Sequence, residues 1–291
     1  MRVRRSLVAV LLTASPAIAG CGDVNAALKE IADARHLAGD LQVTFTKASD
    51  AANRAVMADT DAASVQYAQE ANAEKQAVRD DIGRLRPLLE TLRFSEEGRI
   101  LGEFETRFGA YDTLDRQILE LAVENTNLKA QRLSFGDGQA GADAFRDALR
   151  ALAAGRDVSR LTATTATALA AVREIQVLQA RHIADPEDAS MTTIEARMEA
   201  EETAARDALA ALPALVDPAS RPKLAAATDA LNRFMDVNAR IVALSRRNTN
   251  VRSLALSLNQ KRQVIPPCQQ SLQALRDALN RRGYPKGRWG A

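Results

Sequence analysis

Apolar residues recur at alternating steps of three and four along most of the chain, which is the spacing of one face of an α-helix. In residues 24–57 the repeat is regular enough to form one narrow stripe, as expected for a helix that packs in a bundle. The first element is therefore predicted to be a long bundle helix. Its stripe consists of Ile31, Ala34, Ala38, Leu41, Phe45, Ala48, Ala52 and Ala55.

Breaks in this pattern divide the rest of the chain into further helices. The polar run Asp59-Thr60-Asp61 and the Asp-Pro pairs at 185–186 and 217–218 supply helix stops and N-caps. Gly136-Asp137-Gly138 is predicted to be a turn between antiparallel helices. The predicted helices cover about 24–57, 61–92, 95–135, 139 to Gly155 or beyond, 157–183, 190–212, 221–258 and 266–282.

The chain contains an internal repeat. Residues 125–129, Asn-Thr-Asn-Leu-Lys, recur 123 residues later as 248–252, Asn-Thr-Asn-Val-Arg, and the apolar positions around them recur as well. The repeat predicts two tandem units, residues 21–155 and 156–282, each an up-and-down four-helix bundle of long helices. The sequence leaves open whether the units stack end to end through a helix across Gly155 or pack side by side.

Composition supports an all-α fold class and argues against nucleic-acid binding. Good helix formers such as alanine are abundant, whereas the 291 residues include only 14 Gly and 9 Pro. The 39 basic and 37 acidic side chains nearly cancel, so the chain lacks the positive charge that binding to phosphates requires. We therefore expect no nucleic-acid partner.

The first twenty residues have the features of an export signal. Arginines within residues 2–5 precede the apolar run 7–12, and the stretch ends in Ile18-Ala19-Gly20-Cys21. This ending resembles the lipobox of bacterial lipoproteins, which implies removal of residues 1–20 and acylation of the Cys21 thiol. The alternative is an ordinary secretory signal that leaves Cys21 as a free thiol.

Acylation of Cys21 predicts a protein that is held by its N-terminus on the periplasmic side of a bacterial membrane. No other run in the sequence is apolar enough to span a bilayer, so the lipid is the expected membrane attachment. The tail, residues 283–291, contains several Gly and Pro residues and is predicted to be flexible.

No motif predicts an enzyme, a cofactor or a metal site. The two histidines, His36 and His182, fall in different units. Residues 136–141 match the G-x-G-x-x-G pattern of dinucleotide-binding folds, but no strand precedes them. Cys268 follows Pro266-Pro267, a predicted helix start that would stabilise a thiolate. A core position is favoured for it instead, because a lone cysteine lacks a resolving partner.

Asn125 and Asn248 are the strongest candidate ligand-binding residues, because both are predicted to face inward at equivalent places in the two units. Thr126 and Thr249 follow them directly. These residues fit two roles, a pocket for a small polar ligand or a polar layer that fixes helix register. Arg132 is predicted to lie on the same inward face as Asn125, where it would bind an anionic group or extend its charged end into water.

Exported, alanine-rich four-helix units with polar residues in the seam resemble the periplasmic sensor domains of methyl-accepting chemotaxis receptors. The resemblance covers roughly residues 24–280 as two copies and implies sensing of small molecules, such as amino acids or organic acids. Those receptors continue through a second membrane helix, which this sequence lacks, so signalling is expected to pass through an envelope protein partner. The alternative is a structural envelope lipoprotein that binds partner proteins without a small ligand, and a homodimer is left open.

Overall fold

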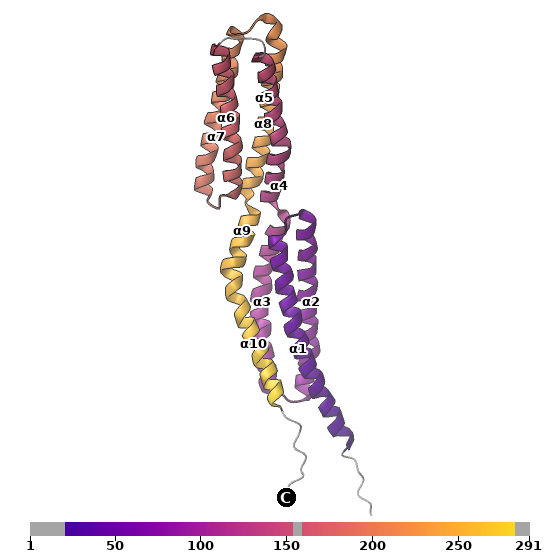
Figure 1. Cartoon of the computed structure of the whole chain (residues 1–291). Helices are drawn as coiled ribbons and strands as arrows, with labels where there is room; N and C mark the ends of the chain where they lie inside the picture. Colours follow the sequence, from indigo (N-terminus) through magenta and orange to yellow (C-terminus); the bar gives the residue numbers. More distant parts are fainter. Residues whose placement is uncertain (1–20, 154–158, 283–291) are drawn as a thin grey trace, which may run out of the picture.

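The computed structural model describes residues 21–153 and 159–282, and within these ranges every long element is an α-helix (Figure 1). The all-α prediction is thereby confirmed. The predicted signal, the predicted flexible tail and the boundary at Gly155 lie outside the described residues. The helices are α1 (Cys21–Met57), α2 (Asp61–Thr91), α3 (Ser95–Glu124), α4 (Thr126–Leu133), α5 (Gln139–Ala153), α6 (Ser159–Ala184), α7 (Asp188–Ala211), α8 (Arg221–Arg247), α9 (Thr249–Leu256) and α10 (Arg262–Arg281).

Four shorter helical segments connect these elements. Two are π-helical turns, η1 (Ser134–Gly138) and η4 (Ser257–Lys261), and two are 3₁₀ turns, η2 (Leu212–Ala214) and η3 (Pro218–Ser220). The two π-helical turns lie 123 residues apart, which is the spacing of the sequence repeat. No helix in the described part of the chain is long and apolar enough to cross a membrane.

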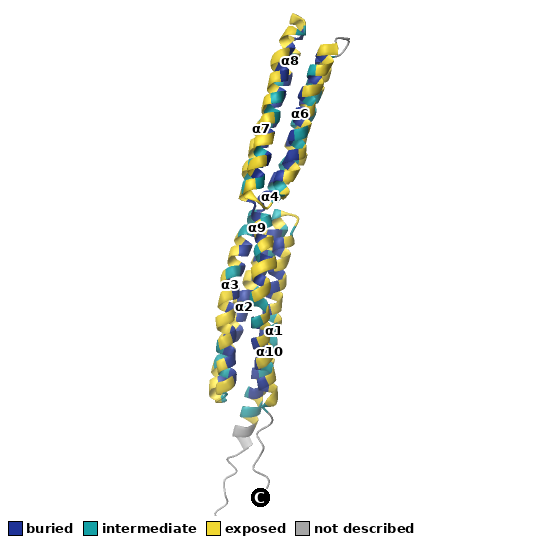
Figure 2. Cartoon of the chain, turned by 90° about the vertical axis from the view of Figure 1, so that its left-hand side faces the viewer, coloured by how far each residue is buried: buried dark blue, intermediate teal, exposed yellow. Residues whose placement is uncertain are grey.

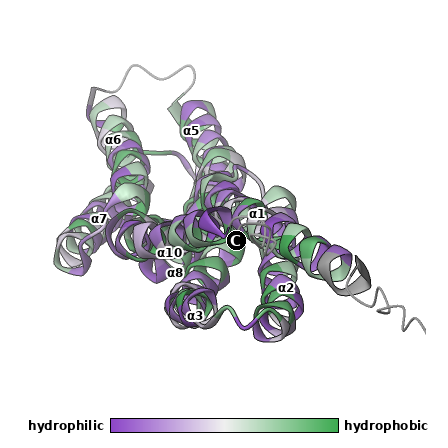
Figure 3. Cartoon of the chain, turned by 90° about the horizontal axis from the view of Figure 1, so that it is seen from below, coloured by the Kyte–Doolittle hydropathy of each residue, from purple (hydrophilic) through white to green (hydrophobic). Residues whose placement is uncertain are grey.

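The helices form two four-helix bundles that follow one another along a rod (Figure 1). The lower bundle consists of α1, α2, α3 and the run from α9 to α10, and the upper bundle consists of the run from α4 to α5 with α6, α7 and α8. Seen from below, α5, α6 and α7 lie to one side of α1 and α2, so the two bundles are offset sideways (Figure 3). Each bundle keeps the up-and-down order of its helices.

The spatial division differs from the predicted units 21–155 and 156–282. The chain passes between the bundles at Asn125 and again at Asn248, so the last helix of each sequence repeat packs in the other bundle. The reason is that the chain does not turn back at Gly136. It continues through η1 into α5, which runs to Ala153 and packs against α8.

Glycine in this segment allows close helix packing, which corrects the predicted turn. A Cβ atom on Gly141 would lie 3.2 Å from the Cα atom of Phe234, so α5 and α8 approach each other closely here. A Cβ atom on Gly138 would lie 3.1 Å from the carbonyl oxygen of Leu133, within the π-helical turn. Gly141 therefore serves a close contact between helices, and Gly138 lies against the backbone of its own helical segment.

The predicted apolar stripe of the first helix is buried from Ile31 to Ala55. Figure 2 shows buried positions running along one face of the helices and exposed positions along the opposite face. The core of the lower bundle contains an aromatic cluster of Phe45, Phe104, Phe108 and Tyr111, in which the rings of Phe45 and Tyr111 lie 5.1 Å apart. The hydrophobic contact of these rings joins α1 to α3.

Cys268 belongs to the same core and is fully buried. Its helix begins at Arg262 rather than at the predicted start, Pro266, so both prolines lie inside α10. Burial raises the pKa of the Cys268 thiol to about 11. The side chain therefore acts as a core residue and is not activated as a thiolate.

The close approach at Gly141 predicts that Gly141→Ala lowers the free energy of unfolding by about 1–2 kcal/mol, because overpacking outweighs the gain in helix propensity. Gly83→Ala is the control, since nothing lies within 4 Å of its added Cβ atom. The control should gain about 0.5–1 kcal/mol. Urea unfolding of both variants measures the difference, and equal stabilisation of the two would contradict the packing described here.

Candidate functional site

The two crossings between the bundles are each marked by an asparagine in the left-handed conformation. Asn125 has φ 51° and ψ 40°, and Asn248 has φ 53° and ψ 36°. Asparagine is one of the few residue types other than glycine that adopts this conformation readily. Each asparagine ends one helix and begins the next, so the helix axis changes direction at both places.

The spacing of Asn125, Arg132 and Phe135 in the sequence predicts one inward face along a single helix over 95–135, and the left-handed Asn125 interrupts that face. A left-handed residue rotates the following helix relative to the preceding one, so positions that continue the stripe in sequence no longer face inward. Phe135 is 72% exposed. Arg132 is also exposed, and its guanidinium lies 2.7 Å from the Asp61 carboxylate at the start of α2. Its anionic partner is thus a residue of this chain, and of its two predicted positions the one that extends toward water is observed.

The first residues of α4 and α9 cap each other. The backbone N–H of Thr126 donates to Thr249 Oγ1 at 3.1 Å, and the backbone N–H of Thr249 donates to Thr126 Oγ1 at 3.1 Å. One residue further, the N–H of Asn127 donates to Asn250 Oδ1 at 3.1 Å, and the N–H of Asn250 donates to Asn127 Oδ1 at 3.2 Å. Equivalent residues of the two repeats therefore meet in an approximate two-fold arrangement.

The physical cause is that two helix N-termini lie side by side. The first N–H groups of a helix have no partner within the helix, and they carry partial positive charge. Threonine and asparagine oxygens satisfy these donors across the contact, whereas neither Asn125 nor Asn248 caps its own helix through its side chain. We call the six residues of this contact, Asn125, Thr126, Asn127, Asn248, Thr249 and Asn250, the junction.

The amide side chains of the junction also bond across it. Asn127 Nδ2 donates to Asn248 Oδ1 at 2.8 Å, and Asn250 Nδ2 donates to Asn125 Oδ1 at 2.8 Å. Glu124 and Arg247 flank the junction at equivalent repeat positions and form an ion pair of 2.8 Å. Asn125, Asn248, Thr126 and Thr249 are at most 2% exposed, so this network is shielded from water.

The junction is asymmetric where it meets the turn between α6 and α7. Asn127 Nδ2 donates to the carbonyl of Ile183 at 2.7 Å, and Asn248 Nδ2 donates to the carbonyl of Asp185 at 2.9 Å. The Nδ2 group of Asn125 has no hydrogen-bond partner although it is buried. The junction is therefore fixed more firmly to the upper bundle than to the lower one.

The structure brings together four of the five predicted ligand-binding residues, Asn125, Thr126, Asn248 and Thr249. Their polar groups are directed at one another and at backbone carbonyls, which is the geometry of the predicted polar layer. Sequence reasoning missed Asn127 and Asn250 as partners, although both belong to the repeated motif. The repetition itself was the available signal, because equivalent residues near a two-fold axis contact one another.

The lower bundle holds a buried charged cluster of Lys75, Asp112, Asp115 and Lys261. Asp115 lies 2.9 Å from the Lys75 ammonium and 2.7 Å from the Lys261 ammonium, and Asp112 lies 3.2 Å from Lys75. Burial lowers the pKa of Lys261, and Asp115 opposes this change. Burial opposes ionisation of Asp112, but Lys75, Arg79 and Arg116 together outweigh it and leave the Asp112 pKa lowered. The paired charges serve to hold α2, α3 and η4 together.

The upper bundle holds a cluster around His182, which is fully buried on α6. Its Nδ1 atom lies 2.7 Å from Ser245 Oγ, and its Nε2 atom lies 2.7 Å from Glu195 Oε1. Arg246 donates to Glu195 Oε2 at 2.8 Å. The Arg246 hydrogen bond, with a contribution from His182, keeps the Glu195 pKa below its usual value despite partial burial.

A serine, a histidine and a glutamate in contact invite comparison with a catalytic triad, but the arrangement differs in two respects. The histidine presents Nδ1 to the serine and Nε2 to the carboxylate, the reverse of the chymotrypsin arrangement. Ser245 Oγ also donates to the backbone carbonyl of His182 at 2.9 Å, and Ser245 is fully buried. Its proton is committed to the backbone, so it is not poised as a nucleophile.

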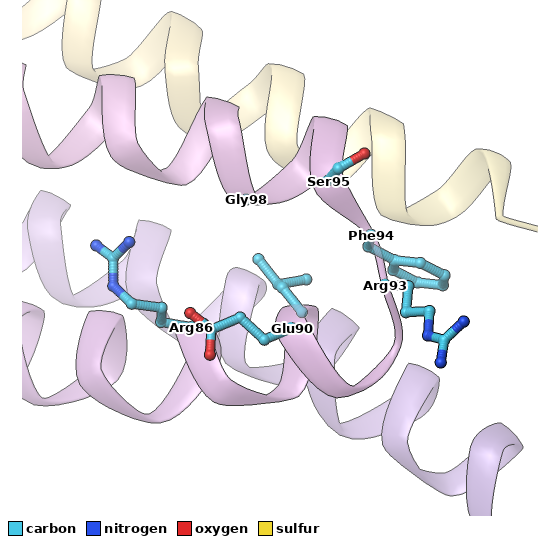
Figure 4. A pocket seen from close by; sticks show the side chains of 7 residues that line it. Arg86, Glu90, Arg93, Phe94, Ser95 and Gly98 are labelled. Carbon is cyan, nitrogen blue, oxygen red and sulfur yellow. The ribbon is translucent and has the colours of Figure 1, made fainter.

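Of the cavities along the described helices, two are candidates for ligand binding, and both lie away from the junction. One, of about 420 Å³, lies at the lower end between α2 and α3. Figure 4 shows Arg86 and Glu90 on one side of it and Ser95 and Gly98 on the other. The other, of about 200 Å³, lies between α7 and α8 and is lined by residues that include Met198, Asn238 and Ala239. Within the described ranges no group of three or more His, Cys, Asp or Glu side chains is placed to hold a metal ion.

No protein-family model matches this chain, and no curated protein sequence matches it significantly.

The junction geometry predicts that Asn248→Ala lowers the free energy of unfolding by about 2–4 kcal/mol, because it removes two side-chain hydrogen bonds and places alanine in a left-handed conformation. Asn125→Ala should cost about 1 kcal/mol less, since Asn125 Nδ2 has no partner to lose. Chemical denaturation measures both values. Asn248→Gly, which tolerates the left-handed conformation, isolates the hydrogen bonds, and a larger loss for Asn125→Ala would contradict the asymmetry.

Proposed function

We propose that this protein is an exported, membrane-tethered helical rod that acts as an adaptor between a membrane surface and a partner protein of the envelope. The observation that carries the proposal is the junction, where the best candidate ligand-binding residues bond to each other and join two bundles into one elongated body. Such a network supports a mechanical role more directly than ligand binding.

The positions of the first and last described helices support a membrane tether at one end of the rod. Helix α1 begins at Cys21 and α10 ends at Arg281, and both of these ends lie at the lower end (Figure 1). A lipid on Cys21 would therefore hold the lower bundle near the membrane. The 30 residues of α3 alone span about 45 Å, so the upper bundle would lie well beyond the lipid headgroups.

Exposed apolar side chains on the two π-helical turns support a partner surface. Phe135 on η1 is 72% exposed, and Leu258 on η4 is 51% exposed. They occupy equivalent positions of the sequence repeat, 123 residues apart. π-helical turns recur at functional sites, and we infer that this repeated pair of exposed side chains contacts a partner.

A photo-crosslinking amino acid at position 135 is expected to give one defined adduct with an envelope protein in cells that export the chain. The reason is that Phe135 is the most exposed large apolar residue in the described part of the molecule. Immunoblotting and mass spectrometry of the adduct provide the measurement. The adduct should be lost in Cys21→Ser, which cannot carry the thioether-linked lipid.

Position 203 on α7 is the matched control, because Thr203 is exposed on the upper bundle and contributes only a hydroxyl bonded to its own helix. The adaptor proposal fails if the probe at position 135 gives no adduct, or gives the same pattern as the probe at position 203.

A sensor of small polar molecules is the second candidate, and the cavity between α7 and α8 favours it. The cavity holds about 200 Å³, and Asn238 contributes a buried amide that is bonded to Gln179 at 2.8 Å. An amide at the base of a partly apolar pocket is typical of sites for small ligands. The resemblance to chemotaxis sensor domains supports the same candidate.

The sensor candidate predicts that an amino acid or organic acid raises the melting temperature of the protein in a thermal-shift screen. Ala239→Trp should abolish the rise, because the indole would fill the cavity that Ala239 lines. Ala226→Trp on the exposed face of α8 is the control and should keep it. A screen without any stabilising compound, or equal responses of both variants, would argue against this site.

A further inference from the structure

The end of α10 is bound to α1 at the lower end of the rod. Arg35 of α1 donates from Nε to the carbonyl of Leu279 at 3.1 Å, and it donates from Nη2 to the carbonyl of Arg282. The last carbonyl groups of a helix have no partner within the helix, and a guanidinium at the C-terminus satisfies them. The chain therefore leaves the bundle at the level of Arg35.

The side chain of Arg282 binds the same end of α10 to α3. Its Nε atom lies 2.7 Å from the carboxylate of Glu97, which is buried, and its guanidinium lies over the ring of Phe94, 4.5 Å from the ring centre. Arg282 is thus held by α1 through its carbonyl and by α3 through its guanidinium. The residues that follow it start from one defined place on the bundle.

Helix α1 continues beyond this level, toward the predicted lipid. Cys21 lies 14 residues before Arg35 in the same helix, which corresponds to about 21 Å of helix. Figure 1 shows α1 extending past the end of α10. A lipid on Cys21 would therefore hold the end of α10 within about 20 Å of the phospholipid headgroups.

The described surface at this end carries charges of both signs. Glu90, Arg93 and Glu96 flank the turn between α2 and α3, and all three are exposed. Figure 4 shows Arg93 beside this turn. The turn has no excess of positive charge that would attract an anionic bilayer, so such an attraction has to come from another part of the chain.

Residues 283–291, which lie outside the described residues, have the composition of a membrane-surface segment. They contain Lys286, Arg288, Tyr284 and Trp289 and no acidic residue. Each lysine or arginine near an anionic membrane surface strengthens binding about fivefold. Tryptophan and tyrosine favour the same region, because their rings are apolar and their polar groups reach the headgroups.

We propose that residues 283–291 bind the surface of an anionic phospholipid bilayer and form a second membrane contact beside the lipid anchor. Seven extended residues span about 24 Å, so Trp289 can reach the headgroups from the end of α10. One contact would then follow α10 and the other would precede α1, and two contacts restrict the tilt of the rod more than one. This second contact rests on the membrane tether of the proposed function.

Trp289 is the only tryptophan of the chain, so tryptophan fluorescence reports on these residues alone. Protein that starts at Cys21 and carries no lipid can be coupled through the Cys21 thiol to a maleimide lipid in vesicles. Cys268 is fully buried, so it does not compete in this reaction. The coupling supplies the tether chemically, so the result does not depend on acylation of Cys21 in cells.

On vesicles of brominated phosphatidylcholine and phosphatidylglycerol, the emission of Trp289 should move to shorter wavelength and be quenched by bromine. Vesicles without phosphatidylglycerol should give much less of both effects. Lys286→Gln together with Arg288→Gln should lower the ratio of bound to free tryptophan about 25-fold. Arg173→Gln together with Arg240→Gln is the control, because it removes the same charge from exposed positions of the upper bundle and should change nothing.

Two results would overturn this second contact. The first is an emission on phosphatidylglycerol vesicles that stays at the wavelength of a water-exposed indole. The second is an emission at short wavelength before vesicles are added, without quenching by bromine, since the indole would then lie in the cavity between α2 and α3. The tether itself fails separately, if mass spectrometry of the exported protein finds no lipid on Cys21.

Discussion

Two helix N-termini side by side are the constraint on which the rest of this structure depends. Backbone N–H groups at the start of α4 and α9 have no partners within their own helices, and burial excludes water from them. Thr126 and Thr249 satisfy these donors for each other, as do Asn127 and Asn250. Without this mutual capping the chain could not pass from one bundle to the other at both places while keeping its helices buried.

The repeat explains how such a contact arises within one chain. Equivalent residues approach an approximate two-fold axis, so each half of the motif supplies what the other lacks. Duplication within one chain also permits the halves to differ. Glu124 and Arg247 occupy equivalent positions and form an ion pair, which two identical copies could not do because the charges would be alike.

The two bundles have also diverged in their buried polar residues. Asp115 of the lower bundle, paired with Lys75 and Lys261, corresponds in the repeat to Asn238, which bonds to Gln179 in the upper bundle. Buried charges must be paired, and Lys75 and Lys261 supply the partners of Asp115 from α2 and η4. The upper bundle instead has a cavity beside its amide, and its buried His182 ring lies against Glu195.

The sequence by itself determined the helices, the buried stripe from Ile31 to Ala55 and the repeat, because periodicity and breakers act locally. It placed Asn125 and Asn248 at inward-facing positions, and both are buried, but it placed them as separate sites in two units. Only the tertiary structure decided that the two asparagines meet. The left-handed asparagines have their partners more than a hundred residues away in sequence, and Gly141 packs against Phe234, roughly ninety residues away. Arg132 turned outward and His182 gained its partners for the same reason: the partners lie on other helices, and sequence spacing carries no information about them.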